Sequence, residues 1–327
     1  ECRNDPGGYF VIDGKEKVIV SQEIFGDNML YIKEGVNDQY SHSIEIRTLS
    51  EDSSKPKRTF SIRMVAETSY TGKQLVALVP NVKKPVPIFI LMRALGIISD
   101  KAIMEMCLLD IDKEHVFKEL FIPSIHDAGE IFTQEQALQY IATLVKNQNV
   151  ASAMEVLSHF LLPNVGTTNF THKAYTIGYM VRRLLNVVVG KESPTDRDSF
   201  RYKRVHVAGM LLYDLFKEYY KLQIRNIRTK IDTKYYFDPS YRDNMQSLIY
   251  KNSIEFFKDR IVEDGFRKAF KGRWGSQEYT SKDGVVQDLN RLSFFGFLAH
   301  LRKVNLNMEA SAKVIAPRYL HSTQWGI

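Results

Sequence analysis

The first eighty residues contain short apolar segments and segments that alternate between apolar and polar positions, both of which are typical of β-strands. Two such segments, 9–12 and 17–20, are separated by Asp13 and Gly14, a pair that readily adopts the positive φ angles of a tight hairpin turn. The polar segment 50–57 contains a proline and predicts an exposed loop. Alternation predicts further strands at 44–47 and 60–65, and the apolar run 75–79, which ends before Pro80, predicts another.

From residue 85 onward the apolar positions recur every three or four residues, as expected for α-helices. Pro85 and Pro87 can begin the first helix and Gly96 can end it. Thr133, with Gln136 three residues later, is a capping-box pattern. Strands followed by helices predict an α+β fold, and no internal repeat is visible. The predicted helices are 85–95, 99–109, 133–146, 150–161, 171–189, 195–231 (whose first part can be an extended connection) and 240–271.

Length and composition limit the class of protein. At 327 residues the chain is longer than one compact core usually holds, so two or more domains are expected. Cys2 and Cys107 support neither a disulfide framework nor a zinc site, which favours a reducing, intracellular compartment. The sequence has no apolar run of about 18 residues that would predict a membrane-spanning helix. Residues 1–20 lack the pattern of a secretory signal.

The positive charge lies in the second part of the chain. Residues 1–195 contain 21 Lys and Arg against 23 Asp and Glu, whereas residues 196–327 contain 24 against 15. Such asymmetry indicates that the second part faces a polyanion. A solvated basic face is the alternative, and charge alone does not separate the two.

Signatures of catalytic sites are scarce. The sequence contains no glycine-rich phosphate loop, no zinc-protease helix motif and no nucleophile-elbow motif. Asp196, Arg197 and Asp198 form the tightest charged cluster. Because one guanidinium group can bind two carboxylates, we interpret this cluster as a structural ion network.

A basic stripe is predicted on one helix. Lys217, Lys221, Arg225 and Arg228 follow one another at helical spacing and therefore share a face. We interpret the stripe as a solvated surface, because such stripes are common on exposed helices. The apolar and aromatic residues interleaved with it are predicted to be the buried face: Leu212, Leu215, Phe216, Tyr219 and Leu222.

Residues 291–325 combine basic and aromatic side chains. Basic groups bind phosphates, and the irregular loop 305–314 could approach a nucleic-acid backbone. A basic surface around an aromatic core is the alternative. Ile327 directly follows this run, which predicts a piece cut from a longer protein, because termini are usually polar. The basic residues are Arg291, His300, Arg302, Lys303, Lys313, Arg318 and His321; the aromatic ones are Phe294, Phe295, Phe297, Tyr319 and Trp325.

Six blocks of the sequence carry a family resemblance. They are 5–23 (DPGGYFVIDGKEKVIVSQE), 93–100 (RALGIISD), 178–185 (GYMVRRLL), 196–209 with DRD, KR and AG, 273–291 with RWG and GVVQDLNR, and 298–326. In this order they closely resemble the second-largest, beta-like subunit of multisubunit DNA-directed RNA polymerases. The resemblance extends over essentially the whole chain. The block 93–100 is most similar to the nuclear type that makes messenger RNA, and a divergent eukaryote or a large DNA virus would fit.

The resemblance implies an internal part of that subunit. Residues 1–24 would belong to the protrusion, 25–235 to the lobe, 236–295 to the second part of the protrusion, and 296–327 to the start of the fork. The fold would then be multidomain α+β, with a mixed lobe inserted in a mixed α/β protrusion. In such enzymes the lobe and protrusion line one side of the DNA cleft, and the fork lies beside the RNA–DNA hybrid.

The resemblance also implies a nucleic-acid interface that contacts phosphates without specifying sequence. Segment 305–314 matches the first fork loop. It lacks the glycines and the Arg-Asp-Gly-Lys stretch of the nuclear type, which argues against strong hybrid contact by the loop tip. Gln324 stands where the nuclear type commonly has His. The predicted nucleic-acid-binding residues are Arg291, Arg302, Lys303, Lys313, Arg318 and His321.

The chemistry of such an enzyme is nucleotidyl transfer by two magnesium ions. The resemblance places the metal-binding aspartates mainly in the largest subunit, so it predicts no catalytic residue and no metal in this chain. The implied partners are the largest and other polymerase subunits, the DNA template, the RNA–DNA hybrid and transcription factors on the lobe, with no membrane. The implied location is the nucleus if the chain is cellular, or a virion or cytoplasmic viral factory if it is viral.

Two other functions are considered. The near-neutral charge of residues 1–195 motivates a lobe that acts chiefly as a docking surface for transcription factors, with little nucleic-acid contact. A free-standing nucleic-acid-binding protein would require Ile327 to be a true terminus.

Overall fold

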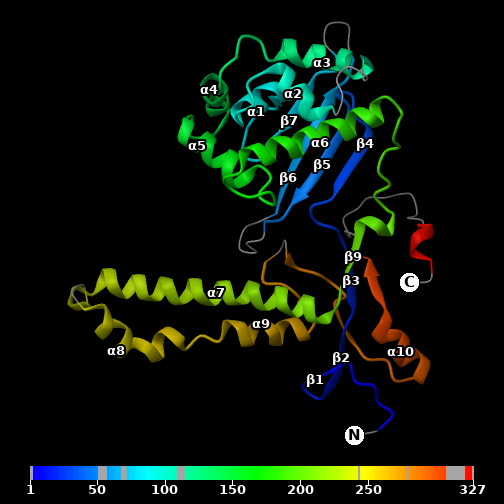
Figure 1. Cartoon of the computed structure of the whole chain (residues 1–327). Coiled ribbons are helices and arrows are strands. Elements are labelled where there is room, and N and C mark those ends of the chain that lie inside the picture. Colours follow the sequence, from blue (N-terminus) through cyan, green and yellow to red (C-terminus); the bar gives the residue numbers. More distant parts are fainter. Residues whose placement is uncertain are drawn as a thin grey trace. The chain divides into compact units, whose positions relative to one another are not determined.

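The computed structural model describes residues 3–50, 57–67, 72–108, 115–241, 244–277, 280–306 and 321–325. Its contacts divide the chain into two compact units (Figure 1). Unit 1 consists of Glu1–Phe25 and Ser199–Ile327, and unit 2 is Gly26–Asp198. Each unit has its own cluster of buried apolar residues. Unit 2 is therefore an insertion in the chain of unit 1.

An antiparallel sheet of five strands forms the centre of unit 2, and its strands lie in the order of the sequence. Ile32, Ile44 and Ile62 lie opposite one another on three neighbouring strands and are at most 1% exposed. The alternation of the sequence thus places apolar side chains on one buried face. The strands are β4 (Leu30–Asn37), β5 (Tyr40–Thr48), β6 (Arg58–Val65), β7 (Leu75–Leu78) and β8 (Val86–Pro87).

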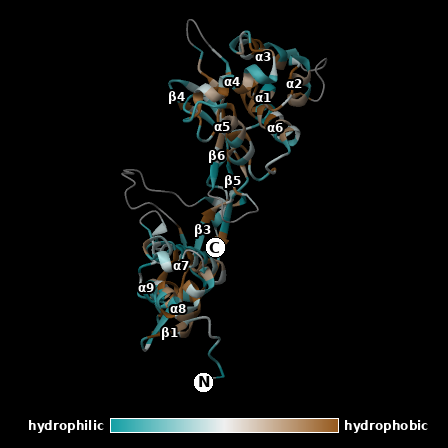
Figure 2. Ribbon diagram, turned by 90° about the vertical axis from the view of Figure 1, so that its left-hand side faces the viewer, coloured by the Kyte–Doolittle hydropathy of each residue, from teal (hydrophilic) through white to brown (hydrophobic). Residues whose placement is uncertain are grey.

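Helices complete the core of unit 2. At the start of α4, Thr133 Oγ1 accepts a hydrogen bond from the Gln136 N–H (3.3 Å), and Gln136 Oε1 accepts one from the Thr133 N–H (3.2 Å). The predicted capping box is confirmed. Apolar and polar residues are interspersed along α6, and the apolar side of this helix packs into the core (Figure 2). The helices are α1 (Ile88–Ala94), α2 (Asp100–Cys107), α3 (His115–Asp127), α4 (Gln134–Leu144), α5 (Val150–Glu155), the π-helix η1 (Val156–Phe160) and α6 (Phe170–Val188).

Unit 1 contains two three-stranded sheets. In the first, β2 lies between β1 and β10; in the second, β3 lies between β11, which is parallel to it, and the antiparallel β9. β1 and β2 form the predicted hairpin, with Asp13 at φ 50° and Gly14 at φ 77°. The strands are β1 (Phe10–Ile12), β2 (Lys15–Ile19), β3 (Ser21–Phe25), β9 (Lys203–His206), β10 (Val286–Asp288) and β11 (Val304–Leu306).

The core of unit 1 lies between the long helix α7 and the returning helix α9. α7 has 30 residues and is about 45 Å long. Leu211, Leu215 and Tyr219 of α7 are buried together with Phe270 and Trp274. The helices are η2 (Phe200–Tyr202), α7 (Ala208–Phe237), η3 (Pro239–Tyr241), α8 (Met245–Phe257), α9 (Ile261–Phe270), α10 (Phe294–Arg302) and η5 (Ser322–Gln324).

The predicted α+β, multidomain class is confirmed, and several elements differ in detail. The helix predicted from 195 begins only at Ala208, because residues 203–206 pair as β9 with β3. Phe216, predicted to be buried, is 46% exposed. The expected boundary at residue 235 lies inside α7, whereas the contacts divide the chain at Asp198, since α7 buries its apolar face in unit 1. The names lobe, protrusion and fork stay a prediction.

Candidate nucleic-acid interface

Arg291 is partly exposed and is bound by residues of the N-terminal segment of unit 1. Its guanidinium carbon lies 4.8 Å from the centre of the Tyr9 ring and 4.5 Å from that of Phe297. The guanidinium group donates two hydrogen bonds of 2.9 Å to Glu16 and one of 3.1 Å to Asp5. Arg291 therefore ties residues 5–16 to α10, and two carboxylates offset its charge.

The contacts of Arg291 shift the pKa values of the carboxylates around it. The pKa of Glu16 is lowered, chiefly by the hydrogen bonds from Arg291. The pKa of Asp5 is lowered first by the backbone N–H of Gly7 and then by Tyr9 and Arg291. The pKa of Arg291 is raised, mainly by Glu16. A phosphate would have to compete with these carboxylates, so the predicted role of Arg291 in nucleic-acid binding stays a prediction.

His300 is buried inside α10 and holds the preceding segment. Its Nδ1 accepts a hydrogen bond from the Asn290 N–H (3.2 Å), and its Nε2 lies 3.1 Å from Gln287 Oε1. These contacts fit a neutral ring with the proton on Nε2. Burial and, secondly, the charge of Lys303 lower the pKa of His300. His300 therefore has a structural role, because it fixes the segment that precedes α10.

Arg302 and Lys303 end α10 and are exposed. Ser293 caps the other end of the helix, accepting a hydrogen bond from the Gly296 N–H (3.0 Å). Cations at the last turn are favoured by the helix dipole. In the described ranges, neither side chain has an ion-pair partner. Both charges are thus available to a ligand.

The segment after Lys303 is fixed to the sheet around β3. β11 pairs with β3, and Asn305 Nδ2 donates a hydrogen bond of 3.2 Å to Gln22 Oε1. On the other side of β3, the Lys203 ammonium lies 2.6 Å from Glu23 Oε1, and both side chains are buried. Glu23 Oε2 also accepts a hydrogen bond from Gln324 (3.0 Å). The sheet thereby holds the short helix η5.

His321 lies directly before η5 and is half-buried. Its Nδ1 accepts a hydrogen bond from the Thr323 N–H (3.1 Å), and the Thr323 hydroxyl lies 2.6 Å from the same nitrogen. Thr323 Oγ1 accepts a hydrogen bond from the Phe200 N–H (2.9 Å). Trp325, 74% exposed, follows. His321 therefore belongs to a docked turn.

The predicted site residues differ in their exposure and in their contacts. Arg302 and Lys303 are exposed without ion pairs, Arg291 is exposed but ion-paired to Asp5 and Glu16, and His321 is part of the turn before Trp325. Lys313 and Arg318 lie outside the described residues. Asp196 Oδ1 accepts a hydrogen bond from the Asp198 N–H (3.0 Å), which closes a local turn. The ion network predicted for Asp196, Arg197 and Asp198 stays a prediction.

The buried pair of Glu23 and Lys203 was missed by the sequence analysis. The sequence signal was weak, because each residue lies in a strand of only four or five residues whose partner is distant in the sequence.

Over the residues that the structure describes, no group of three or more His, Cys, Asp or Glu side chains is placed to hold a metal ion. The described helices are also too short or too polar to cross a bilayer.

Known proteins are similar to this chain over its whole length. Residues 28–206 match the family RNA polymerase Rpb2, domain 2, and residues 287–327 match RNA polymerase Rpb2, domain 3. The chain is 38% identical to the DNA-directed RNA polymerase II subunit RPB2 of Encephalitozoon cuniculi and 32% identical to subunit 2 of Arabidopsis thaliana. It is 30% identical to subunit Rpo2 of Saccharolobus solfataricus. In each comparison 100% of this chain aligns with 28% of the relative's length.

Proposed function

The chain belongs to the RNA polymerase Rpb2 family, and from this premise we propose that it acts as part of the second-largest subunit of a DNA-directed RNA polymerase. In this role it lines the DNA cleft and the side of the RNA–DNA hybrid during transcription. The polymerase's largest subunit and its other subunits are the proposed protein partners. The relatives that are eukaryotic polymerase II subunits support a nuclear location if the chain is cellular.

One observation carries the proposed nucleic-acid contact. Arg302 and Lys303 lie side by side, exposed and without an ion pair to any described residue, in the segment that matches domain 3. α10 and the pairing of β11 with β3 hold them on regular structure. Fixed cations bind the phosphates of any sequence, as a polymerase requires.

The family's domain names can be assigned to the two units. We propose that unit 2, which coincides closely with the domain 2 match, is the lobe. Residues 1–25 and 199 to about 295 would then be the protrusion, and the remainder the start of the fork. This assignment moves the end of the lobe from residue 235 to 198, because α7 shares its core with α9.

The proposed chemistry of the whole enzyme is nucleotidyl transfer with two magnesium ions. We propose that this chain contributes no catalytic residue and no metal ligand. Its Arg302 and Lys303 would instead hold the nucleic acid in place.

The proposed contact is tested by measuring how the 327-residue chain binds a short fluorescent RNA–DNA hybrid at several salt concentrations. The variant combines Arg302→Ala with Lys303→Ala. We expect weaker binding, with the slope of log K against log salt reduced by about 0.9 for each phosphate that the variant no longer binds. Lys101→Ala with Lys118→Ala removes two cations from unit 2 and serves as the matched control.

An unchanged affinity and slope for the Arg302 and Lys303 variant would count against the proposed contact. So would an equal loss in the control, because binding would then depend only on net charge.

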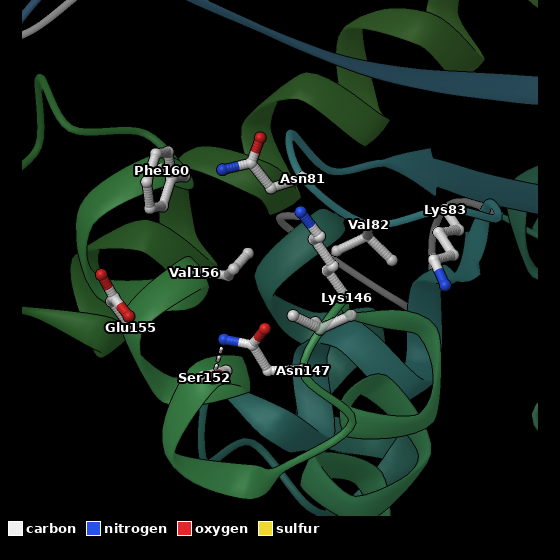
Figure 3. A pocket seen from close by; sticks show the side chains of 10 residues that line it. Asn81, Val82, Lys83, Lys146, Asn147, Ser152, Glu155, Val156 and Phe160 are labelled. Carbon is white, nitrogen blue, oxygen red and sulfur yellow. Dashed lines mark hydrogen bonds between the residues drawn. The ribbon is translucent and has the colours of Figure 1, made fainter.

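A second candidate function concerns unit 2. A pocket of about 750 Å³ lies beside α5 and the π-helix (Figure 3). Its lining combines Lys83 and Lys146 with apolar Val82, Val156 and Phe160. A depression whose lining mixes apolar, polar and both positively and negatively charged side chains fits a protein segment better than a phosphate backbone. It supports docking of transcription factors on the lobe.

Crosslinking from position 146 tests the docking function. The whole polymerase would carry a photoreactive residue in place of Lys146, and the products would be identified by mass spectrometry. Protein crosslinks are expected. Crosslinks to nucleic acid alone would argue against docking at this pocket.

A further inference from the structure

The solvent-facing side of α7 carries both cations and aromatic rings. Lys217, Lys221, Arg225 and Arg228 lie along this side. Tyr213 and Tyr220 are interleaved with them and are 60% and 49% exposed. The sequence pattern alone favoured a solvated stripe, because such stripes are common on exposed helices.

The aromatic rings form an open stack. Phe216 and Tyr220 lie with their ring centres 5.7 Å apart and their planes at 19°. The other contact of Phe216 is with the edge of Phe266, 6.5 Å away. Tyr220 is the exposed end of this stack, so a further flat ring could be added to it.

The cations on this side of α7 are largely unneutralised. In the part of the chain that the structure describes, Lys217, Lys221 and Arg225 have no ion-pair partner. Arg228 lies 3.8 Å from Asp232, and both side chains are more than half exposed, which makes a weak pair. Asp214 is 3.8 Å from His206 at the start of the helix. Lys221, Arg225 and Arg228 are thus exposed and Lys217 is half-buried, with one carboxylate toward each end of the stripe.

We propose that this side of α7 binds single-stranded nucleic acid. Cations that follow one another by one helical turn meet successive phosphates, while bases stack on Tyr220 and Tyr213. A duplex would use the cations but leave the rings without a role, because its bases are already stacked. An acidic protein segment would likewise gain little from the flat ring faces. The site is distinct from Arg302 and Lys303 and does not depend on them.

Fluorescence anisotropy of a labelled single-stranded oligonucleotide tests the site on the 327-residue chain. Lys221→Gln with Arg225→Gln is expected to reduce the slope of log K against log salt by about 1.4, since each phosphate bound on a single strand contributes about 0.7. Lys251→Gln with Lys258→Gln removes the same charge from the exposed surface of unit 1 near α8 and should leave the slope nearly unchanged.

The rings are tested separately. Tyr220→Ala is expected to weaken binding of the single strand at least about fivefold, and to leave binding of a duplex of the same sequence unchanged. Tyr236→Ala, at an exposed ring beyond the stripe, is the matched control. Circular dichroism confirms that α7 is retained in each variant.

Four outcomes would overturn the proposal. The first is an equal loss in the stripe variant and its control. The second is a Tyr220→Ala variant that loses duplex and single-strand affinity alike. The third is a wild-type chain that binds a polyglutamate peptide as tightly as the oligonucleotide, which would indicate a site for acidic protein. If only the Arg302 and Lys303 variant is impaired, the proposed function stands and this inference fails.

Discussion

The Lys203 ammonium on β9 lies 2.6 Å from Glu23 Oε1 on β3, and the two side chains are only 3% and 5% exposed. The same ammonium lies 4.0 Å from the centre of the Phe25 ring, and Gln324 donates to the second oxygen of Glu23. A buried pair of this kind is costly to break, because removing one partner leaves an uncompensated charge.

Lys203→Met is therefore expected to lower the free energy of unfolding of unit 1 by about 3–5 kcal/mol. The protein's two tryptophans, Trp274 and Trp325, both belong to unit 1, so their fluorescence during urea unfolding reports on this unit. Adding Glu23→Leu should restore most of the loss, because no charge then remains buried.

Lys271→Met is the control for the buried pair. Its ammonium lies 3.1 Å from Asp13 on the surface, where an ion pair contributes at most about 1 kcal/mol. Equal losses of unfolding free energy in the Lys203 and Lys271 variants would mean that burial of an ion pair does not determine how much its removal destabilises unit 1.

The ion pairs of Arg291 with Asp5 and Glu16 predict that the stability of unit 1 depends on pH in the acid range. The folded-state pKa values of Asp5 and Glu16 are lowered, so their contribution to stability is complete above their ordinary values of 3.8 and 4.5. It is lost as the pH falls through the lowered values, because the unfolded chain binds protons first. Arg291→Met should thus be less stable than the wild type near neutral pH, and the two should converge in acid.

Tryptophan-monitored urea midpoints over this pH range test the Arg291 prediction. Two curves that stay parallel down to the lowest pH would show that the carboxylates do not depend on Arg291.

The boundaries of the fold were predictable where local chemistry determines them. The hairpin at Asp13 and the cap at Thr133 need only neighbouring residues, and both are confirmed. The start of α7 was not predictable, because residues 203–206 become a strand only through their distant partner β3. Long-range pairing of this kind leaves no periodic signal in a segment of four residues.

Buried charges limited the prediction of the site. Lys173 is fully buried, and its ammonium donates hydrogen bonds of 2.7 Å to the carbonyls of Leu157 and Ser158 in the π-helix. Arg93 is 2% exposed and donates to Asp100 and to the carbonyl of Ile131. Each charge is bound by groups in other elements, so the pattern of polar positions in the sequence predicts an exposed side chain where the structure has a buried one.

His300 predicts a second pH effect, at milder acidity. Its folded-state pKa is lowered from the ordinary 6.5 by burial and by Lys303. The contribution of His300 to the stability of unit 1 is therefore fully present above pH 6.5. It falls as the pH drops from there towards the lowered pKa, because the unfolded chain gains the proton first. His300→Asn, which keeps an uncharged donor and acceptor, should remove this step from the urea midpoints of unit 1.

Lys303→Gln refines the His300 prediction. Removing the positive charge should bring the pKa of His300 closer to its ordinary value and make the step smaller. A step of unchanged size in both variants would assign it to another group.

Cys107 provides a probe of unit 2, which contains no tryptophan. The side chain is 2% exposed, and burial raises the pKa of its thiol to about 12. We expect it to react with iodoacetamide only when unit 2 unfolds, because the thiolate is the reactive form. The measurement needs Cys2→Ser, so that Cys107 is the single thiol. Rapid modification in the absence of denaturant would contradict the buried position.

Gly178 on α6 is required by the close approach of α2. A Cβ atom at this position would lie 2.6 Å from the carbonyl oxygen of Met106, which is backbone and cannot turn away. Ala is the better helix former by about 1 kcal/mol, but forcing the helices apart costs about 1–3 kcal/mol or more. Gly178→Ala should therefore destabilise unit 2 and increase the rate at which Cys107 is modified at moderate urea concentrations.

Gly209→Ala is the matched control, because its Cβ would meet no heavy atom within 4 Å. There the gain in helix propensity is unopposed, and the stability of unit 1 should rise by up to about 1 kcal/mol. The opposite signs of the two glycine substitutions separate close packing from propensity. If Gly178→Ala proved as stabilising as Gly209→Ala, α2 and α6 could not approach as closely as the structure places them.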